Sequence, residues 1–291
     1  MGPRPLAPRP PPTGVLTLAS TEFGHVYDDN DLALANELAY RIALALDNAR
    51  AYEQKAAAAR ALQRSLVPDL AEIPGLEVAA RYLPADGEIG GDFYDVFPCG
   101  GAGRWIVAMG DVSGKGVAAA ALSAMVRHVL HALGRTATDP AVLLRSLHTT
   151  VAAELPGERF CTVACATLTI DAGGARLCIA SAGHPLPLIL RRTGELETVG
   201  RPGTLLGTLD SIDVADESTD LRPGDTVVLY TDGALRHRPG DDPPGDIALR
   251  ETLAAAVGLP AQEIAERLEN AVRRPDTNAD DTAILVLKIP D

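Results

Sequence analysis

Aspartates stand at the ends of several apolar segments, and they are the side chains in this sequence best suited to chemistry. They fall in four clusters, which read GGDFYD, GDVSGKG, YTDG and NADDT. Carboxylates that converge in space repel one another and lose their charge unless a cation holds them. The clusters therefore predict a cation site, provided that the fold brings them together. Their aspartates are Asp92 and Asp95 in the first cluster, Asp111 in the second, Asp232 in the third, and Asp280 and Asp281 in the last.

The residue types of these clusters indicate which cation would bind. None of the four contains histidine or cysteine, and sites built from oxygen ligands alone favour Mg²⁺ or Mn²⁺ over zinc. Two such ions close together can activate a water and clamp a phosphate group. Three clusters place glycine beside aspartate, which lets the backbone approach a ligand closely. A single Asp-Gly after a strand is usually only a turn, so the recurrence of the pattern favours a site.

Strands and helices must position these aspartates. The many short turns between consecutive strands favour antiparallel sheets over a doubly wound parallel sheet. We therefore expect an α/β protein of the α+β type. Strands are expected at residues 14–20, 76–82, 92–97, 105–110, 160–170, 175–181, 187–190, 225–231 and 282–289, and helices at residues 116–133, 140–154 and 262–272.

A long helix is expected ahead of this region, after a Pro-rich start at residues 1–13. Residues 28–66 contain neither glycine nor proline, and acidic residues at 28, 29 and 31 suit a helix N-terminus. Two interpretations stay open: the helix packs on its own domain, or it joins two chains in a homodimer through an alanine-rich seam. Apolar side chains recur at steps of three and four, at Leu34, Leu38, Ile42, Ala45, Ala49, Tyr52, Ala56 and Ala59.

Composition excludes several classes of function. The net charge of −13 argues against nucleic-acid binding, which needs a basic surface. No apolar run approaches the ~18–20 residues that span a bilayer, so no membrane insertion is expected. The N-terminus lacks the apolar core of a secretory signal, and we expect a cytoplasmic location. Cys161 and Cys165 would share one face of a strand as buried structural thiols, since the close pairs and histidines of a zinc site are missing.

Six motifs in residues 60–291 resemble the SpoIIE/RsbU-type branch of the metal-dependent protein phosphatases (PPM, type 2C-like). In chain order they are LQRSLVP, GGDFYD, GDVSGKG, SAGHPLPL, LYTDG and ADDTAILVL. Each motif alone is weak, whereas the ordered set is specific. The resemblance implies an α-β-β-α sandwich of two antiparallel sheets flanked by helices, with a metal site at one end, preceded here by the long N-terminal helix.

The resemblance also implies roles for individual residues. Asp111 would bridge two Mn²⁺ or Mg²⁺ ions and hold the bridging water that acts as the nucleophile, so no phosphoenzyme is expected. The implied metal ligands are Asp92, Asp111, the backbone carbonyl of Val112, Asp232 and Asp280, with Asp281 as the alternative to Asp280.

Four other residues carry weaker assignments. His184 is expected to stabilise a turn rather than donate a proton. Lys115 and Arg81 are phosphate contacts or, more simply, surface cations. The family often places a glutamate shortly after TDG, but this chain has Arg236 near that place, which would weaken the support of the metal ligands.

The function implied by the resemblance is hydrolysis of phosphoserine or phosphothreonine. The substrate would be an anti-sigma-factor antagonist of the STAS type in bacterial signalling. Residues 68–291 would form the phosphatase domain and residues 54–67 a helical linker, while residues 1–53 resemble the last strand and helix of a GAF domain. The main alternative is a catalytically weak or inactive regulatory dimer module of the same fold. A small-molecule phosphoesterase is a further alternative, and a diguanylate cyclase would leave most aspartate motifs unexplained.

Overall fold

The computed structural model describes residues 14–17, 27–66, 68, 70, 72–84, 90–151, 159–171, 173–235, 245–273 and 281–291, with the backbone alone at residues 55–66. Contacts divide the chain into two units, Met1–Ala58 and Ala59–Asp291. The domain boundaries expected from the sequence, at residues 53 and 67, stay a prediction.

The expected long helix is present as α1 (Asp29–Leu66). Asp28 caps it, because its Oδ1 accepts the N–H groups of Asn30 and Asp31 at 2.8 and 3.0 Å. Asp31 returns a bond by accepting the N–H of Asp28 at 3.0 Å. These backbone hydrogen bonds hold the pKa of the Asp28 carboxyl below its ordinary value. The helix start is therefore set by local side chains.

The apolar side chains predicted along one side of α1 are present, but the first residues of the strand predicted before the helix do not form a strand. Leu34, Leu38 and Ile42 lie along one side of α1 and are 61, 42 and 46% exposed. The strand expected at residues 14–20 is wrong where it can be checked, because residues 14–17 have no regular secondary structure. A strand is stable only when a neighbour satisfies its backbone groups. Residues 18–20 lie outside the described part.

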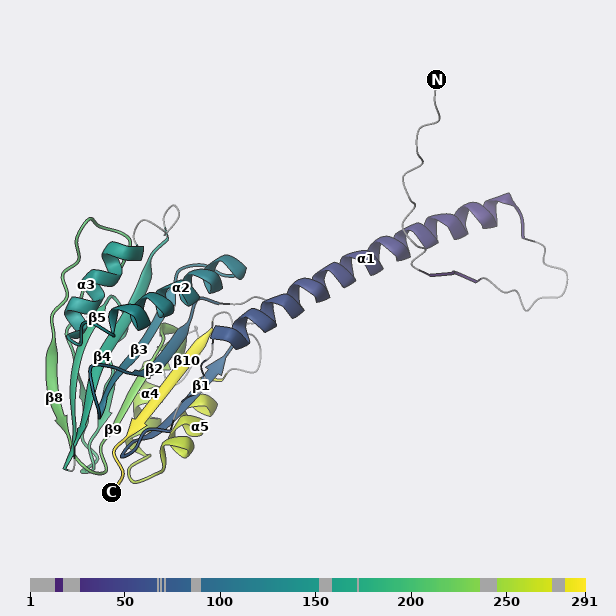
Figure 1. Ribbon diagram of the computed structural model, residues 1–291. Coiled ribbons are helices and arrows are strands. Elements are labelled where there is room, and N and C mark those ends of the chain that lie inside the picture. The colour runs from purple at the N-terminus through teal and green to yellow at the C-terminus, as the bar shows by residue number, and fades with distance from the viewer. Residues whose placement is uncertain are drawn as a thin grey trace. The chain divides into compact units, whose positions relative to one another are not determined.

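The second unit is the expected α-β-β-α sandwich (Figure 1). Both sheets are antiparallel, with five strands each. The β10 sheet has the order β1 (Glu77–Leu83), β10 (Thr282–Lys288), β9 (Thr226–Tyr230), β6 (Leu188–Leu190), β7 (Leu196–Thr198). The β3 sheet has the order β2 (Phe93–Pro98), β3 (Arg104–Val112), β4 (Cys161–Asp171), β5 (Gly174–Ala182), β8 (Glu217–Leu221).

Helices cover the outer faces of the two sheets. On the outer face of the β3 sheet, side chains of the strands form a hydrophobic core with side chains of α2 (Val117–Leu133) and α3 (Pro140–Val151). On the outer face of the β10 sheet, side chains of the strands form a second hydrophobic core with side chains of α4 (Gly245–Ala254) and α5 (Ala261–Val272). A third cluster fills the space between the sheets. The strands at the centre of each sheet are therefore buried on both faces, which explains their nearly continuous apolar sequences.

Alternation along β3 shows how this packing works. Val107 and Met109 belong to the cluster between the sheets, while Ile106 and Ala108 pack under the helices, and all four are fully buried. By the same period of two, Asp111 follows Val107 and Met109 toward the space between the sheets. The strand thus aims this aspartate at the other sheet.

Every strand expected between residues 76 and 289 is present, with ends shifted by at most two residues. The sequence missed β7, β8, α4 and the short 3₁₀ helix η1 (Asp232–Leu235). Strand β8 reads ESTDL and lies at a sheet edge, where few of its side chains meet the core. Its polar sequence therefore carries no apolar pattern to detect.

The cysteine prediction agrees with the structure. Cys161 and Cys165 are fully buried on the helix-covered face of the β3 sheet. Burial raises the pKa of both thiols, to about 12 for Cys165, so both stay neutral. Among the helices described, none is both long and apolar enough to cross a bilayer.

Candidate metal centre

Strand register places two of the predicted ligands opposite each other in the β3 sheet. Asp92 immediately precedes β2, and Asp111 is the penultimate residue of β3. Because Phe93 pairs with Gly110, the next pair along the antiparallel ladder is Asp92 and Asp111. The Val112 N–H donates to the carbonyl of Gly91 at 3.2 Å, which continues this ladder.

The β10 sheet contributes its own aspartates at the same end of the sandwich. Asp281 immediately precedes β10, and Asp232 begins η1 directly after β9. Thr231 lies between β9 and η1 and is paired with Ala283: its N–H donates to the Ala283 carbonyl at 3.1 Å, and its Oγ1 accepts the Ala283 N–H at 2.9 Å. The two aspartates are thus held at neighbouring strand ends.

One hydrogen bond joins the two sheets at this point. Thr231 Oγ1 donates to Asp92 Oδ2 at 2.7 Å, and both side chains are buried. The hydroxyl therefore accepts a hydrogen bond from the Ala283 N–H and donates its own proton in a hydrogen bond to Asp92. Sequence reasoning missed Thr231. The available signal was a hydroxyl at the end of a buried apolar strand, next to an aspartate, where an unpaired polar group would be costly.

The electrostatics of Asp92 show that the four carboxylates share one site. Its pKa lies well above the ordinary value, first because of burial and then because of the negative charge of Asp111. Asp281 and Asp232 raise it further, whereas the hydrogen bond from Thr231 lowers it. The fold thus brings together carboxylates from both sheets, in an arrangement that a cation would stabilise.

Two glycines allow this close approach. A Cβ on Gly90 would overlap the carboxylate of Asp281. A Cβ on Gly91 would overlap the Val112 carbonyl oxygen and would lie 2.8 Å from Asp111 Oδ1. The segment before Asp92 therefore passes against the oxygens that the sequence assigns to metal binding, as the glycines of GGDFYD predicted.

The donor set suits Mg²⁺ or Mn²⁺, because all of its atoms are oxygens. Within the described residues, no three acidic, histidine or cysteine side chains are already arranged to enclose an ion. The expected set also includes a backbone oxygen, that of Val112, and the carboxylate of Asp280. Asp280 lies outside the described residues, as does Arg236.

Asp281 is the member of the Asp-Asp pair whose position is described. It is 2% exposed, and its Oδ2 accepts a hydrogen bond from the hydroxyl of Tyr82 at 2.5 Å. Tyr82 lies near the end of β1 and was another residue that sequence reasoning missed. Its hydroxyl holds the Asp281 carboxylate in one orientation, as partners that support metal ligands do.

His184 stabilises a turn, as expected. Its Nδ1 lies 2.9 Å from Thr162 Oγ1. Ser181 Oγ donates to the His184 carbonyl at 2.7 Å and accepts its N–H at 3.1 Å. Burial lowers the pKa of His184 to about 3, so near pH 7 the imidazole is neutral rather than an imidazolium ion that could act as a general acid.

The other cations near the motifs are engaged or exposed. Arg81 forms ion pairs with Glu266 at 2.8 Å and Glu269 at 2.9 Å on α5, so it ties β1 to that helix. Lys115 is exposed in the loop before α2. In the same loop the Ser113 N–H donates to the carbonyl of Phe160 at 2.9 Å and is therefore not available to a phosphate group.

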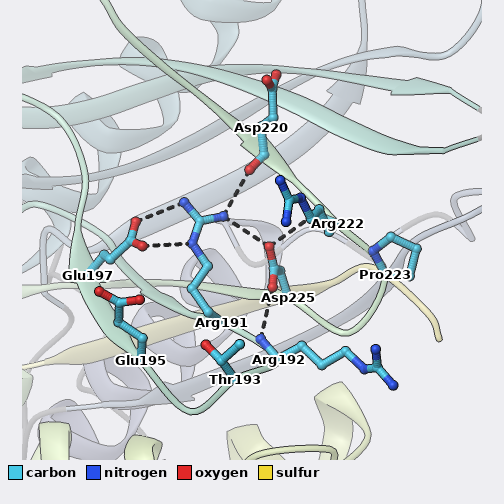
Figure 2. Close-up of a pocket in the computed structure, with 9 residues that line it drawn as sticks. All are labelled: Arg191, Arg192, Thr193, Glu195, Glu197, Asp220, Arg222, Pro223 and Asp225. Carbon is cyan, nitrogen blue, oxygen red and sulfur yellow. Dashed lines mark hydrogen bonds and ion pairs between the residues drawn. The ribbon is translucent and has the colours of Figure 1, made fainter.

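A cavity of about 830 Å³ lies at the other end of β9, away from the aspartates (Figure 2). Arg191 forms two hydrogen bonds with Glu197, at 2.8 and 3.1 Å, and one with Asp225 at 2.9 Å. It also donates to the carbonyl of Asp220 and to Thr219 on β8. The cluster joins the β10 sheet to the β3 sheet, and its central cation, Arg191, is paired with the carboxylates of Glu197 and Asp225. It is therefore structural.

Comparison with known proteins identifies the family. The profile described as Stage II sporulation protein E (SpoIIE) matches residues 101–290. Phosphoserine phosphatase RsbU from Bacillus subtilis (strain 168) is 26% identical over 182 residues, which cover 62% of this chain and 53% of RsbU. Protein IcfG from Synechocystis is 26% identical over 223 residues, which cover 67% of this chain and 35% of IcfG. The chain therefore spans about half or less of the length of these relatives.

Solved structures agree with the sandwich. The RsbU and RsbW domains of Rv1364c from Mycobacterium tuberculosis align with a TM-score of 0.62 and 28% identity, over 77% of this chain and 62% of that one. The SiaA-PP2C domain of Pseudomonas aeruginosa aligns with a TM-score of 0.68 and 22% identity, over 83% and 98% of the two chains. The resemblance to a GAF domain stays a prediction. The chain belongs to the SpoIIE family, and its second unit has the fold of a PP2C phosphatase domain.

Proposed function

We propose that this chain is a metal-dependent protein serine/threonine phosphatase that hydrolyses phosphoserine or phosphothreonine. The observation that carries the proposal is the convergence of Asp92 and Asp111 from one sheet with Asp232 and Asp281 from the other, which the strand register, the Thr231–Asp92 hydrogen bond and the close approach of Gly90 to Asp281 support. Membership of the SpoIIE family and similarity to a phosphoserine phosphatase support it.

The proposed cofactors are two Mn²⁺ or Mg²⁺ ions. When bound, they would lower the pKa of a water that attacks the phosphorus and would neutralise charge on the phosphoryl group. RsbX, which shares the fold, has been solved with magnesium, and PstP with two manganese ions. The ions would be held by Asp92, Asp111, the carbonyl of Val112, Asp232 and Asp280, with Asp281 as the alternative to Asp280.

The protein groups around these ligands have separate tasks. Asp111 would stand at the centre, because it faces the space between the sheets and influences Asp92 most strongly among the charges there. Thr231 and Tyr82 would fix the orientation of Asp92 and Asp281 by their hydrogen bonds. The nucleophile would be a metal-activated water and not a side chain, so no phosphoenzyme is expected.

The proposed substrate is a phosphorylated anti-sigma-factor antagonist of the STAS type, in the cytoplasm of a bacterium. Similarity to RsbU and to a chain that carries RsbU and RsbW domains supports this choice. A homodimer through α1 is also proposed, since Leu34, Leu38 and Ile42 leave an exposed apolar side on that helix. Light scattering should then give twice the chain mass, and Leu38→Glu with Ile42→Glu should reduce it to one chain.

The test is Mn²⁺-dependent phosphate release from a phosphorylated STAS antagonist. Asp111→Asn should lower the rate at least about 100-fold, because it removes the central carboxylate of a two-metal site. Asp171→Asn, an exposed substitution at the far end of β4, should retain the wild-type rate. A wild type as inert as Asp111→Asn at millimolar Mn²⁺ would contradict the proposal. Calorimetry that detects no Mn²⁺ binding would then favour a regulatory module without activity.

A further inference from the structure

Helix α2 contacts the segment just before Asp92 through the hydroxyl of Ser123. Ser123 is fully buried, and its Oγ donates to the carbonyl of Gly91 at 2.6 Å. The same Oγ lies 3.1 Å from the carbonyl of Ala119, one turn earlier in the helix. A hydroxyl has one proton, and the shorter distance assigns it mainly to Gly91. The principal hydrogen bond of Ser123 thus leaves the helix for the segment that carries Asp92.

The carbonyl of Gly91 occupies a sensitive position. Its other hydrogen bond comes from the Val112 N–H, at the longer distance of 3.2 Å. The α-carbon of Gly91 lies so close to the Val112 carbonyl and to Asp111 Oδ1 that no Cβ fits. Asp92 is the next residue along the chain. The orientation of this peptide therefore bears on three groups that are proposed to bind metal.

Glycine makes this peptide dependent on outside support. Gly90 and Gly91 have no side chains to pack, and glycine has the widest choice of backbone angles. A hydrogen bond from a helix that is itself packed on the β3 sheet removes that freedom. Ser123 has the only polar side chain in the seven-residue stretch AAAALSA of α2. Burying its hydroxyl is unfavourable unless the hydroxyl forms a hydrogen bond.

We infer that Ser123 is a positioning residue for the metal centre: its hydrogen bond to Gly91 holds Asp92, and through the Gly91 peptide the Val112 carbonyl and Asp111, in the geometry that binds metal. The inference rests on the proposed function of the site. Hydroxyls of α3 offer a contrast, because Thr149 and Thr150 donate only to carbonyls of their own helix, at 3.1 and 2.9 Å.

The experiment compares Ser123→Ala and Ser123→Thr with Thr150→Ala in the full chain. Thr150→Ala is the control. It also removes a helix hydroxyl, but the hydrogen bond that is lost goes to the Ser146 carbonyl within α3 and not to the segment that carries Asp92. Calorimetry measures the Kd for Mn²⁺, and a titration of activity gives the Mn²⁺ concentration for half-maximal rate. Ser123→Ala should raise both by about 10–100-fold, as loss of support behind metal ligands does, with kcat at saturating Mn²⁺ within about twofold of wild type. Ser123→Thr should recover most of the affinity.

Each outcome decides between a positioning role and a structural one. If Ser123→Ala lowers Tm but binds Mn²⁺ as wild type does, the inference is overturned while the phosphatase proposal stands. If the wild type neither binds Mn²⁺ nor releases phosphate, the proposed function fails and the inference with it. Should Ser123→Ala not fold, Ser123→Cys supplies the comparison, since a thiol is a weaker donor and should give an intermediate Kd.

Discussion

At the scale of single residues, the site depends on polar side chains whose hydrogen bonds go to defined partners. Thr231 shows this most clearly, because its hydroxyl accepts from Ala283 on its own sheet and donates to Asp92 on the other. The residues around the aspartates are therefore not a general polar surrounding. They fix the direction of individual carboxylate oxygens, and this is what a preorganised metal site requires.

His184 leads to a prediction about pH. Its folded-state pKa is about 3, against an ordinary value of 6.5. Below pH 6.5 the unfolded chain binds a proton that the folded chain does not, so stability is present above that pH and is lost as the pH falls toward 3. Each unit below 6.5 should cost up to about 1.4 kcal/mol. Urea unfolding at pH 7.5, 6.0 and 5.0, without added metal, measures the slope.

Glutamine in His184→Gln cannot take up this proton. The variant's unfolding free energy should therefore fall less than that of the wild type, by up to about 1.4 kcal/mol for each pH unit below 6.5. His128→Gln on α2 is the control, because it makes the same substitution at an exposed histidine. Equal slopes for wild type and His184→Gln would show that the imidazole is not held neutral in the fold.

At the scale of elements, chain geometry matters as much as side-chain chemistry. The segment before β2 must pass between Asp281 and the Val112 carbonyl, and only glycine leaves room there. We expect Gly91→Ala to abolish Mn²⁺ binding or to lower its affinity at least about 100-fold, because the neighbour that must move is backbone and part of the proposed ligand set. Calorimetry and the phosphatase assay measure this, and Tm shows whether the chain still folds.

A glycine outside the site provides the comparison. At Gly173 a Cβ would meet nothing nearer than Asp171 Oδ1 at 3.6 Å, so Gly173→Ala should bind Mn²⁺ as wild type does. Wild-type affinity in Gly91→Ala would mean that the Gly91 peptide can move without disturbing the centre, contrary to the packing observed.

At the scale of the whole domain, two clusters at opposite ends of the sandwich join its sheets. One is the Thr231–Asp92 hydrogen bond at the candidate metal centre, and the other is the cluster around Arg191 (Figure 2). Arg191 is 18% exposed and Asp225 5%. Arg191→Met should cost about 3 kcal/mol of unfolding free energy, because it leaves a buried carboxylate without its cation.

The control for this substitution is Arg176→Met, which removes an ion pair with Asp220 whose partners are 64 and 74% exposed and should cost less than about 1 kcal/mol. Urea unfolding measures both. The affinity for Mn²⁺ should stay unchanged in Arg191→Met, since the aspartates lie at the other end of β9. A matching loss of affinity would show that the two ends are coupled.

The sequence alone determined most of the local elements and identified the candidate carboxylates. Apolar runs bounded by turns marked the buried strands, and an apolar repeat at steps of three and four marked α1, because that helix carries its apolar side chains along one side. The polar edge strand β8 and helix α4 escaped, since neither shows such a pattern clearly. Asp92, Asp111 and Asp232 stood out because aspartate beside glycine at a strand end is unusual when it recurs.

Tertiary structure alone decided which groups meet. Thr231 bonds to Asp92 across 139 positions of sequence, and Tyr82 to Asp281 across 199. Such pairs follow from the stacking of two sheets, and no local pattern contains that information. The same is true of Ser123, which looks like any helix serine until the packing of α2 places it beside Gly91. The sequence thus determined the carboxylates, and the fold decided their neighbours, because side-chain type is local whereas contact depends on the register and packing of distant strands.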